Sequence, residues 1–206
     1  MIVIIDYGVG NLFSLKSSLL SIGENADSSS DFSVIDKADG IILPGVGAFS
    51  DAADKLIKSG LSDILIKKAH EGVPLLGICL GMQLLFDKSY EYGEHSGLKL
   101  LRGEVRPIPN ENGKLKIPHI GWNSLKLTRP SRLFKYINEG DYVYFVHSYY
   151  ATGCEDHVIA QTEYGTDLTA AVADGNIFGC QFHPEKSGEV GLRILKAFCE
   201  MCKEKK

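Results

Sequence analysis

Short apolar runs alternate with helix-like segments in the first half of the chain, and this alternation restricts the fold more than any other feature. The apolar runs have the length of buried strands and lie at residues 2–5, 40–45 and 73–78. Each run is followed by a segment in which apolar residues recur at helical spacing, as Leu12, Leu15 and Leu19 do after the first run. This alternation predicts a parallel sheet that is covered by helices on both faces.

The pattern changes after Phe86, where strand-like segments follow one another with turn residues between many of them. These segments lie at residues 98–108, 117–128, 141–152, 157–165, 168–175 and 176–182. A final helix is expected from about Glu189. Because the chain has 206 residues, no linker and no internal repeat, we expect a single domain over residues 1–206, in which an antiparallel region extends the parallel sheet.

Composition argues against several classes of function. The formal net charge of -4 makes a nucleic-acid partner a poor expectation. No run is long enough to span a membrane and the first residues lack a secretory leader, so we expect a cytoplasmic protein without a membrane partner. The odd number of cysteines, five, fits reduced thiols. Helical spacing explains the CxxC pair Cys199 and Cys202 at the polar end of the last helix, and no metal or cofactor is expected.

One cysteine stands at a bend between a presumed strand and a presumed helix, in the segment GICLG at residues 77–81. A sharp strand-to-helix turn with small residues on both sides exposes its central side chain at the carboxyl edge of a sheet, so Cys79 is a candidate nucleophile. The helix that opens at Leu80 would favour the thiolate, and the Leu80 N–H could donate to an oxyanion. The alternative is a buried cysteine that only fills space.

Among the six histidines, His183 is the best candidate for the base that this thiol needs. Pro184 disfavours helical backbone at the residue before it, so the His-Pro-Glu tripeptide is expected to be extended. Side chains two residues apart then point the same way, and Glu185 would reach the imidazole as the third member of a triad. The alternative is an ordinary turn at the end of a strand. His119 and His147 lie in strand-like segments and are expected to be structural.

A second glycine-rich turn, LPGVGAF from Leu43, follows another presumed strand. Such turns bring backbone amides to the sheet edge where open α/β sheets bind ligands, so a second oxyanion donor from Val46 is the favoured interpretation. The turn lacks the Lys-Ser/Thr ending of a phosphate loop, and DYGVGN near the N-terminus lacks the third glycine of a dinucleotide fingerprint. Nucleotide binding is therefore the weaker alternative.

Together, the motifs GICLGMQLL, PGVGAF and GCQFHPEKS resemble those of the class I, triad-type glutamine amidotransferases, and the resemblance covers nearly the whole chain. It implies a flavodoxin-like three-layer α/β sandwich, with a central, mostly parallel sheet, helices on both faces and an antiparallel extension. Four further features are similar to the glutaminase subunits of imidazole glycerol phosphate synthases, which act in histidine biosynthesis. These are IDYGVGN, IPHIGWN, YFVHSYY and Lys186 directly after the triad glutamate.

The resemblance also implies roles for particular residues. Cys79 would attack the amide carbon of L-glutamine to form a thioester, His183 would protonate the departing ammonia, and Glu185 would orient His183. Backbone amides of Leu80 and Val46 would hold the oxyanion. Five residues match positions that hold glutamine in the family: Gly47, Gln83, Glu91, Ser148 and Tyr149. For Gln83 the spacing agrees, because this residue lies one helical turn after Cys79.

A partner protein is implied in the same way. Ammonia in neutral water is mostly protonated, so a glutaminase that supplies a synthesis must pass it directly to a second protein. By resemblance this is a (β/α)8-barrel cyclase in a heterodimer, which makes imidazole glycerol phosphate and aminoimidazole carboxamide ribonucleotide. Four residues match positions that face it: Asn11, Trp122, Tyr144 and Lys186.

Three alternatives stay open from the residues alone. The same glutaminase chemistry could serve a different synthase. A cysteine peptidase or esterase could use the same bend, although Gln83 and Glu91 suit a small zwitterion better than a peptide. A redox-sensing module would have Cys79 oxidised instead of acylated, but it gives Glu185 no task.

Overall fold

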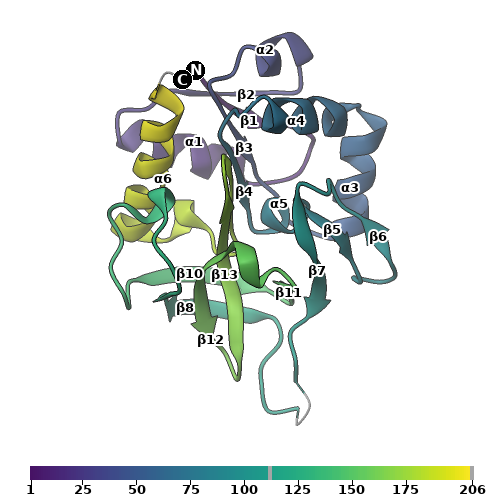
Figure 1. Cartoon of the computed structure of the whole chain (residues 1–206), viewed down its shortest axis with the longest axis vertical. Coiled ribbons are helices and arrows are strands. Elements are labelled where there is room, and N and C mark those ends of the chain that lie inside the picture. Colours follow the sequence, from purple (N-terminus) through teal and green to yellow (C-terminus); the bar gives the residue numbers. More distant parts are fainter. Residues whose placement is uncertain (111–112, 205–206) are drawn as a thin grey trace.

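The computed structural model of the chain describes residues 1–110 and 113–204 and is built around an eight-stranded sheet (Figure 1). In spatial order its strands are β2 (Ala26–Ser29), β1 (Ile2–Ile5), β3 (Gly40–Leu43), β4 (Leu75–Ile78), β14 (Ile177–Cys180), β13 (Asp167–Asp174), β12 (Val158–Glu163) and β9 (Lys126–Leu127). The first five in this order pair in parallel, and the last three continue the sheet in antiparallel pairing. The predicted parallel sheet with an antiparallel extension is confirmed.

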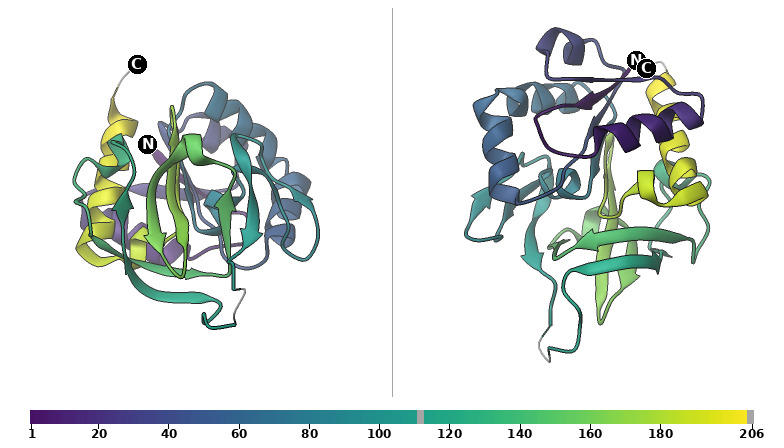
Figure 2. Two further views of the ribbon diagram at one scale, coloured as in Figure 1. Left: turned by 60° about the horizontal axis from the view of Figure 1, so that its bottom comes forward. Right: turned by 180° about the vertical axis from the view of Figure 1, so that it is seen from behind.

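Helices cover both faces of the parallel part. The described residues contain the α-helices α1 (Leu12–Ser21), α2 (Phe32–Asp36), α3 (Phe49–Lys58), α4 (Leu61–His70), α5 (Leu80–Gln83) and α6 (Gly188–Lys203). Successive side chains of a strand point to opposite faces, so in β1 Val3 and Ile5 pack with α2, α3 and α4, whereas Ile2 and Ile4 pack with α1 and α6. Figure 2 shows these two helical layers on either side of the sheet. None of these helices, in the part of the chain that the structure describes, is long and apolar enough to cross a membrane.

Two smaller sheets lie beside the antiparallel part (Figure 1). One pairs β8 (His119–Ser124) with β10 (Tyr142–His147) in antiparallel register. The other contains, in spatial order, β11 (Tyr149–Thr152), β7 (Leu101–Pro107), β5 (Phe86–Ser89) and β6 (His95–Ser96). Short 3₁₀ turns are η1 (Arg132–Phe134), η2 (Glu155–His157) and η3 (Pro184–Lys186).

Local structure differs from the sequence prediction in three places. The helix after Cys79 is a single turn, because α5 ends at Gln83 and β5 follows almost at once. The segment 141–152 is two strands in different sheets, since the chain changes direction at Ser148. Strand β2 and helix α2 have no counterpart in the predicted pattern, because their short sequences, ADSS and FSVID, lack a clear apolar period.

The CxxC pair lies in the core and not at a polar helix end. All five cysteines are free and buried. Cys199 and Cys202 are on the inner side of α6, where burial raises the pKa of each thiol to about 12. A Cβ on Gly40 would lie 2.1 Å from the Cys202 sulfur, so this thiol packs directly on β3. Helical spacing accounts for the pair, as predicted. The predicted polar surroundings are wrong, because both thiols pack in the core.

Candidate active site

The carboxyl ends of four parallel strands meet at one edge of the large sheet, and the candidate site residues follow directly after them. Tyr7 comes after β1, the turn Pro44–Gly47 after β3, Cys79 after β4, and residues 181–183 after β14. The Cys79 N–H donates to the Cys180 carbonyl at 2.7 Å, which ties the end of β4 to β14. Open α/β sheets bind their ligands at this edge.

Cys79 lies at a sharp bend whose backbone angles, φ 54° and ψ -112°, fall outside the usual range for a residue with a side chain. A Cβ on Gly81 would lie 1.9 Å from the Leu43 carbonyl oxygen, and a Cβ on Gly77 would lie 2.6 Å from the Gly81 oxygen. Only glycine fits on either side, and this close packing holds the cysteine in a conformation that costs about 1–3 kcal/mol. The bend predicted from GICLG is present, but the one-turn helix after it supplies less dipole than a long helix would.

His183 and Glu185 are in direct contact, with 2.8 Å between Nδ1 of the imidazole and Oε1 of the carboxylate. The predicted contact is confirmed, but the predicted extended backbone is wrong. Residues Pro184–Lys186 form the 3₁₀ turn η3, which is closed by a hydrogen bond from the Lys186 N–H to the His183 carbonyl. Proline suits the first position of a helical turn because its missing N–H has no partner there, and the turn brings the glutamate back to the ring.

The pKa of His183 is raised from 6.5 to about 9 as the net result of opposing effects. Burial lowers it, because the charged imidazolium loses contact with water, but Cys79 and Glu185 raise it and outweigh burial. His183 therefore carries a proton at neutral pH and lies between the sulfur and the carboxylate. Its Nε2 makes no hydrogen bond to any residue that the structure describes, so this N–H is available for a substrate atom.

Two polar groups contact the Cys79 sulfur that the sequence analysis does not identify. The thiol donates to the Val146 carbonyl oxygen at 3.8 Å, and the side-chain amide of Gln181 donates to the sulfur at 3.7 Å. Gln181 is fully buried. The only signal for it in the sequence is its place in the GCQFHPEKS motif, two residues before the histidine.

The turn Pro44–Gly47 packs tightly against the bend that carries Cys79. A Cβ on Gly45 would lie 2.7 Å from the Gly81 backbone nitrogen, so the two turns touch. From the loop after β1, the buried Tyr7 hydroxyl donates to the Pro44 carbonyl at 2.8 Å. Burial first, and the Cys79 charge second, raise the pKa of this phenol. Val46 follows Gly45 in this turn and is exposed.

Three of the predicted glutamine-binding residues form a connected group. The side-chain nitrogen of Gln83 donates to the Tyr149 carbonyl at 3.1 Å and to Oε1 of Gln181 at 3.0 Å. Both of its N–H groups are therefore used within the protein, and its Oε1 is the atom left for a ligand. The Glu91 carboxylate accepts from the Phe49 N–H at 2.6 Å at the start of α3. Burial, and then the charge of Glu91, raise the pKa of Tyr149, so these two side chains are close.

The other two predicted glutamine-binding residues lie in the segments that follow β3 and β10. Gly47 has φ 94°, a conformation that favours glycine, in the turn that packs on the bend. Ser148 is the single residue between β10 and β11, and its carbonyl accepts from the Ile108 N–H at 2.9 Å. It lies two residues after Val146, the acceptor of the Cys79 thiol.

Three of the four residues predicted to face a partner form one surface cluster. Trp122 and Tyr144 pair across β8 and β10 in an edge-to-face arrangement with 6.0 Å between ring centroids. The Lys186 Nζ lies 6.0 Å from the Tyr144 ring centroid, and because Lys186 belongs to η3, the cluster adjoins the candidate site. Trp122 is 54% exposed, which excludes a core role. Asn11 instead caps α1, where its side-chain oxygen accepts from the Ser14 N–H at 3.1 Å.

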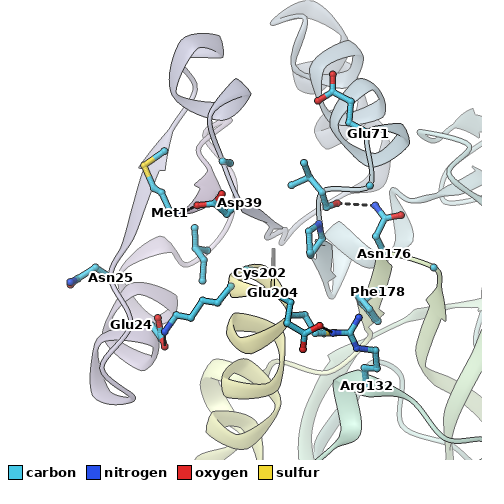
Figure 3. Close-up of a pocket in the computed structure, with 18 of the residues that line it drawn as sticks. Met1, Glu24, Asn25, Asp39, Glu71, Arg132, Asn176, Phe178, Cys202 and Glu204 are labelled. Carbon is cyan, nitrogen blue, oxygen red and sulfur yellow. Dashed lines mark hydrogen bonds and ion pairs between the residues drawn. The ribbon is translucent and has the colours of Figure 1, made fainter. Parts of the chain in front are cut away.

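A cavity of about 980 Å³ lies at the opposite edge of the large sheet, beside the starts of β1, β4 and β14 (Figure 3). Its charged groups are held in ion pairs: the N-terminal amine of Met1 with Asp39, Lys203 with Glu24, Arg132 with Glu204, and Glu71 with Lys68 outside the lining. The length of the strands separates this cavity from Cys79. It is therefore not the place where the thiol acts, despite its size.

Comparison with known proteins identifies the family. The family model described as "Glutamine amidotransferase class-I" matches residues 3–202. The chain belongs to the class-I glutamine amidotransferases. This amidotransferase is 52% identical over 204 residues to the "Imidazole glycerol phosphate synthase subunit HisH" of Caldanaerobacter subterraneus subsp. tengcongensis, with 98% of this chain and 99% of that protein covered. It is also 52% identical over 200 residues to the same subunit of Lactococcus lactis subsp. lactis, with 97% and 98% covered.

Solved structures agree with this assignment at the level of the fold. A structure described as "Crystal structure of glutamine amidotransferase" superposes with a TM-score of 0.76 at 21% identity, covering 98% of this amidotransferase and 99% of that chain. The "Structure of PurLQS from Thermotoga maritima" superposes with a TM-score of 0.73 at 21% identity, covering 97% of each chain. The predicted class I amidotransferase fold is therefore confirmed.

Proposed function

We propose that this amidotransferase is the glutaminase subunit of an imidazole glycerol phosphate synthase and hydrolyses L-glutamine to glutamate and ammonia. The observation that carries the proposal is a thiol at a strained bend, Cys79, beside a protonated His183 that is hydrogen-bonded to Glu185. The similarity to two HisH subunits over nearly the full length of both chains supports the choice of synthase.

In the first half of the reaction, the Cys79 thiol releases its proton to solvent, and the resulting thiolate attacks the side-chain amide carbon of glutamine. A carbon–sulfur bond forms, the carbonyl oxygen becomes an oxyanion, and the carbon–nitrogen bond then breaks. His183 gives the proton on Nε2 to the departing nitrogen, which leaves as ammonia. The free Nε2–H of the resting site and the raised pKa of His183 both suit this general-acid step.

Backbone amides stabilise the oxyanion in this proposal. Leu80 is the first residue of α5, and N–H groups in the first turn of a helix have no acceptor within the helix. Val46 lies in the turn that touches the same bend, which supports it as the second donor. One such donor contributes about 3 kcal/mol to lowering the barrier.

In the second half, water hydrolyses the thioester. His183 is neutral after giving up its proton, so it accepts a proton from water as the water attacks the acyl carbon. Glu185 then stabilises the imidazolium that re-forms and keeps Nε2 directed toward the reacting atoms. The carbon–sulfur bond then breaks, the new carboxyl group gives its proton to the departing sulfur, and glutamate leaves with the thiol and the protonated histidine restored.

The same edge of the sheet supplies groups that suit the two charges of free glutamine. The Glu91 carboxylate fits an α-ammonium group, and its contact with the start of α3 fixes its position. Gly47, Ser148 and Tyr149 lie in the surrounding turns and strand, and Oε1 of Gln83 remains free for a ligand N–H. These groups support a small zwitterionic substrate over a peptide.

A cyclase subunit receives the ammonia in this proposal, as a (β/α)8-barrel partner in a heterodimer. The exposed Trp122 next to Tyr144 and Lys186 supports an interface beside the site, and Asn11 at the start of α1 is a further candidate. The family match to residues 3–202 supports a single amidotransferase domain. Five free cysteines support a reducing, cytoplasmic location.

The test is reconstitution with a cyclase subunit of imidazole glycerol phosphate synthase. We expect imidazole glycerol phosphate from glutamine only when both subunits are present, and from ammonium salts with the cyclase alone. We also expect the purified amidotransferase alone to hydrolyse glutamine slowly, because uncoupled hydrolysis wastes glutamine. High turnover alone, with no product when the cyclase is added, would assign the chain to a different synthase.

A further inference from the structure

A continuous series of buried and partly buried hydrogen bonds starts at the nucleophile and ends at the first residue of β8. It crosses four segments that are far apart in the sequence. In order, its members are the Cys79 sulfur, the Gln181 side chain, the Gln83 side chain, the Tyr149 carbonyl, the His147 imidazole and the His119 imidazole. The four polar side chains in the series are at most 6% exposed, so water does not compete for these bonds.

The direction of every bond in this series is fixed by its one carbonyl. The Tyr149 oxygen can only accept, so the end of Gln83 that faces it at 3.1 Å must be the NH₂ group. The second hydrogen of that NH₂ group goes to the neighbouring amide of Gln181, which must therefore present its oxygen at 3.0 Å. It follows that the NH₂ group of Gln181, and not its oxygen, faces the sulfur at 3.7 Å.

The two imidazoles are fixed by the same carbonyl. Nδ1 of His147 must carry a hydrogen, because it contacts the Tyr149 oxygen at 2.8 Å. In the neutral ring Nε2 is then an acceptor, and it takes the hydrogen of Nδ1 of His119 at 3.0 Å. Burial lowers the pKa of His147 to about 4 and also lowers the pKa of His119, so both rings are neutral near pH 7. His119 is further held between the rings of Phe145 and Tyr164.

We infer that this series orients Gln181 as a hydrogen-bond donor to the Cys79 thiolate, with Gln83, His147 and His119 as positioning residues. A thiolate is stabilised by a donor and destabilised by an acceptor, and an amide side chain carries both at its end. Without its neighbours, Gln181 could turn its oxygen toward the sulfur. The inference deepens the proposed glutaminase function, but its central measurement needs only the thiol.

The central measurement is the pH dependence of Cys79 alkylation by iodoacetamide in the purified full chain, followed by mass spectrometry of the labelled peptide. The titratable side chains that face the sulfur are Tyr7 and His183, with Glu185 behind the imidazole. We expect Gln181→Met, which keeps the length and removes the donor, to move the midpoint of the alkylation profile upward by about one pH unit. Glutamine turnover in the complex should show kcat about tenfold lower and KM nearly unchanged.

Paired variants of His147 test the direction of the series. His147→Asn keeps a donor near the position of Nδ1, whereas His147→Phe keeps a ring and removes the donor. We expect the Asn variant to stay near the wild-type alkylation midpoint and the Phe variant to shift in the same direction as Gln181→Met. The matched control is Asn176→Leu, which removes two partly buried amide hydrogen bonds at the opposite edge of the sheet, to the Ala69 and Val73 carbonyls.

Two results would overturn the inference. One is a Gln181→Met alkylation profile that overlays the wild-type profile in a protein with unchanged thermal stability. The other is an equal shift in His147→Asn and His147→Phe. If Gln181→Met does not fold, Gln83→Met replaces it, because it leaves Gln181 in place and removes only the group that fixes its direction. An unshifted midpoint in that variant also counts against the inference. Alkylation midpoints that shift as expected, in a protein that hydrolyses no glutamine when the cyclase is present, would count against the proposed function and leave the inference standing.

Discussion

Replacing Glu185 by Gln tests the electrostatics of the candidate site. The substitution keeps the size of the side chain and an oxygen that can accept from Nδ1 of His183, but it removes the negative charge. Both side chains are nearly fully buried, at 3% and 5% exposed, so water does not screen their interaction. The pKa of His183 should fall, because Glu185 is one of the two groups that raise it.

The size of the effect follows from the pKa of His183. A rise from 6.5 to about 9 stabilises the folded protein by about 3 kcal/mol, at about 1.4 kcal/mol for each tenfold change in proton affinity. Because the folded-state pKa is the higher one, this stabilisation is complete below pH 6.5 and is lost as the pH rises through about 9. Cys79 and Glu185 share the effect, so the Glu185 contribution is about 1–2 kcal/mol.

The assay is urea unfolding of wild type and Glu185→Gln at pH 6 and pH 10. We expect the free energy of unfolding lost in the variant to be about 1–2 kcal/mol larger at pH 6 than at pH 10. The other consequences of the substitution, such as the loss of a buried carboxylate, are common to both pH values and cancel in the comparison. An equal loss at the two pH values would refute the argument that Glu185 holds a proton on His183.

Three further predictions concern other parts of the molecule. Cys79→Ala should abolish glutamine-dependent synthesis in the complex and leave ammonium-dependent synthesis intact. In urea unfolding, Cys79→Gly should be more stable than Cys79→Ala by about 1 kcal/mol, because a φ of 54° strains only a residue that has a Cβ. Tyr7→Phe should lower kcat about tenfold, because it releases the Pro44 carbonyl. Tyr164→Phe loses an exposed hydrogen bond of the same 2.8 Å length and should leave kcat unchanged. Equal kcat values in the two variants would contradict a role for Tyr7 in holding the turn. Trp122→Ala should weaken binding of the cyclase by about 2 kcal/mol in titration calorimetry, and unchanged affinity would remove it from the interface.

Features that depend on neighbouring residues could be predicted from the sequence. The glycines around Cys79 predict the strained bend, because a close approach of two backbones and a positive φ both require small residues nearby. The contact between His183 and Glu185 is also local, although the sequence predicts an extended segment where the chain forms a 3₁₀ turn. Pro184 permits both, and only the packing of η3 against α6 and β10 decides between them.

Features that depend on contacts between distant segments could not be predicted. Gln181 and Tyr7 each contact the region of Cys79 from a different strand end, and nothing in the residues around them indicates the direction of their side chains. Ser187 is a further case, since its buried hydroxyl donates to the His183 carbonyl at 2.6 Å and accepts from the Tyr144 N–H at 3.0 Å. The pairing of His147 with His119 could not be predicted either, because the sequence indicates only that each is a structural residue in a strand-like segment.

Strand β10 connects the predicted partner surface to both halves of the catalytic arrangement. The Tyr144 carbonyl accepts from the His183 N–H at 3.0 Å, and the Val146 carbonyl accepts from the Cys79 thiol at 3.8 Å. The side chain of Tyr144 is paired with the exposed ring of Trp122, whereas His147, at the end of the same strand, is buried and contacts the Tyr149 carbonyl. A strand is stiff along its length, so a partner that shifts β10 must move the acceptor of the thiol and the acceptor of the histidine backbone together. If the isolated subunit has low activity and a partner raises it, as the proposed function predicts, the effect needs no long path through the molecule, because one strand contacts both.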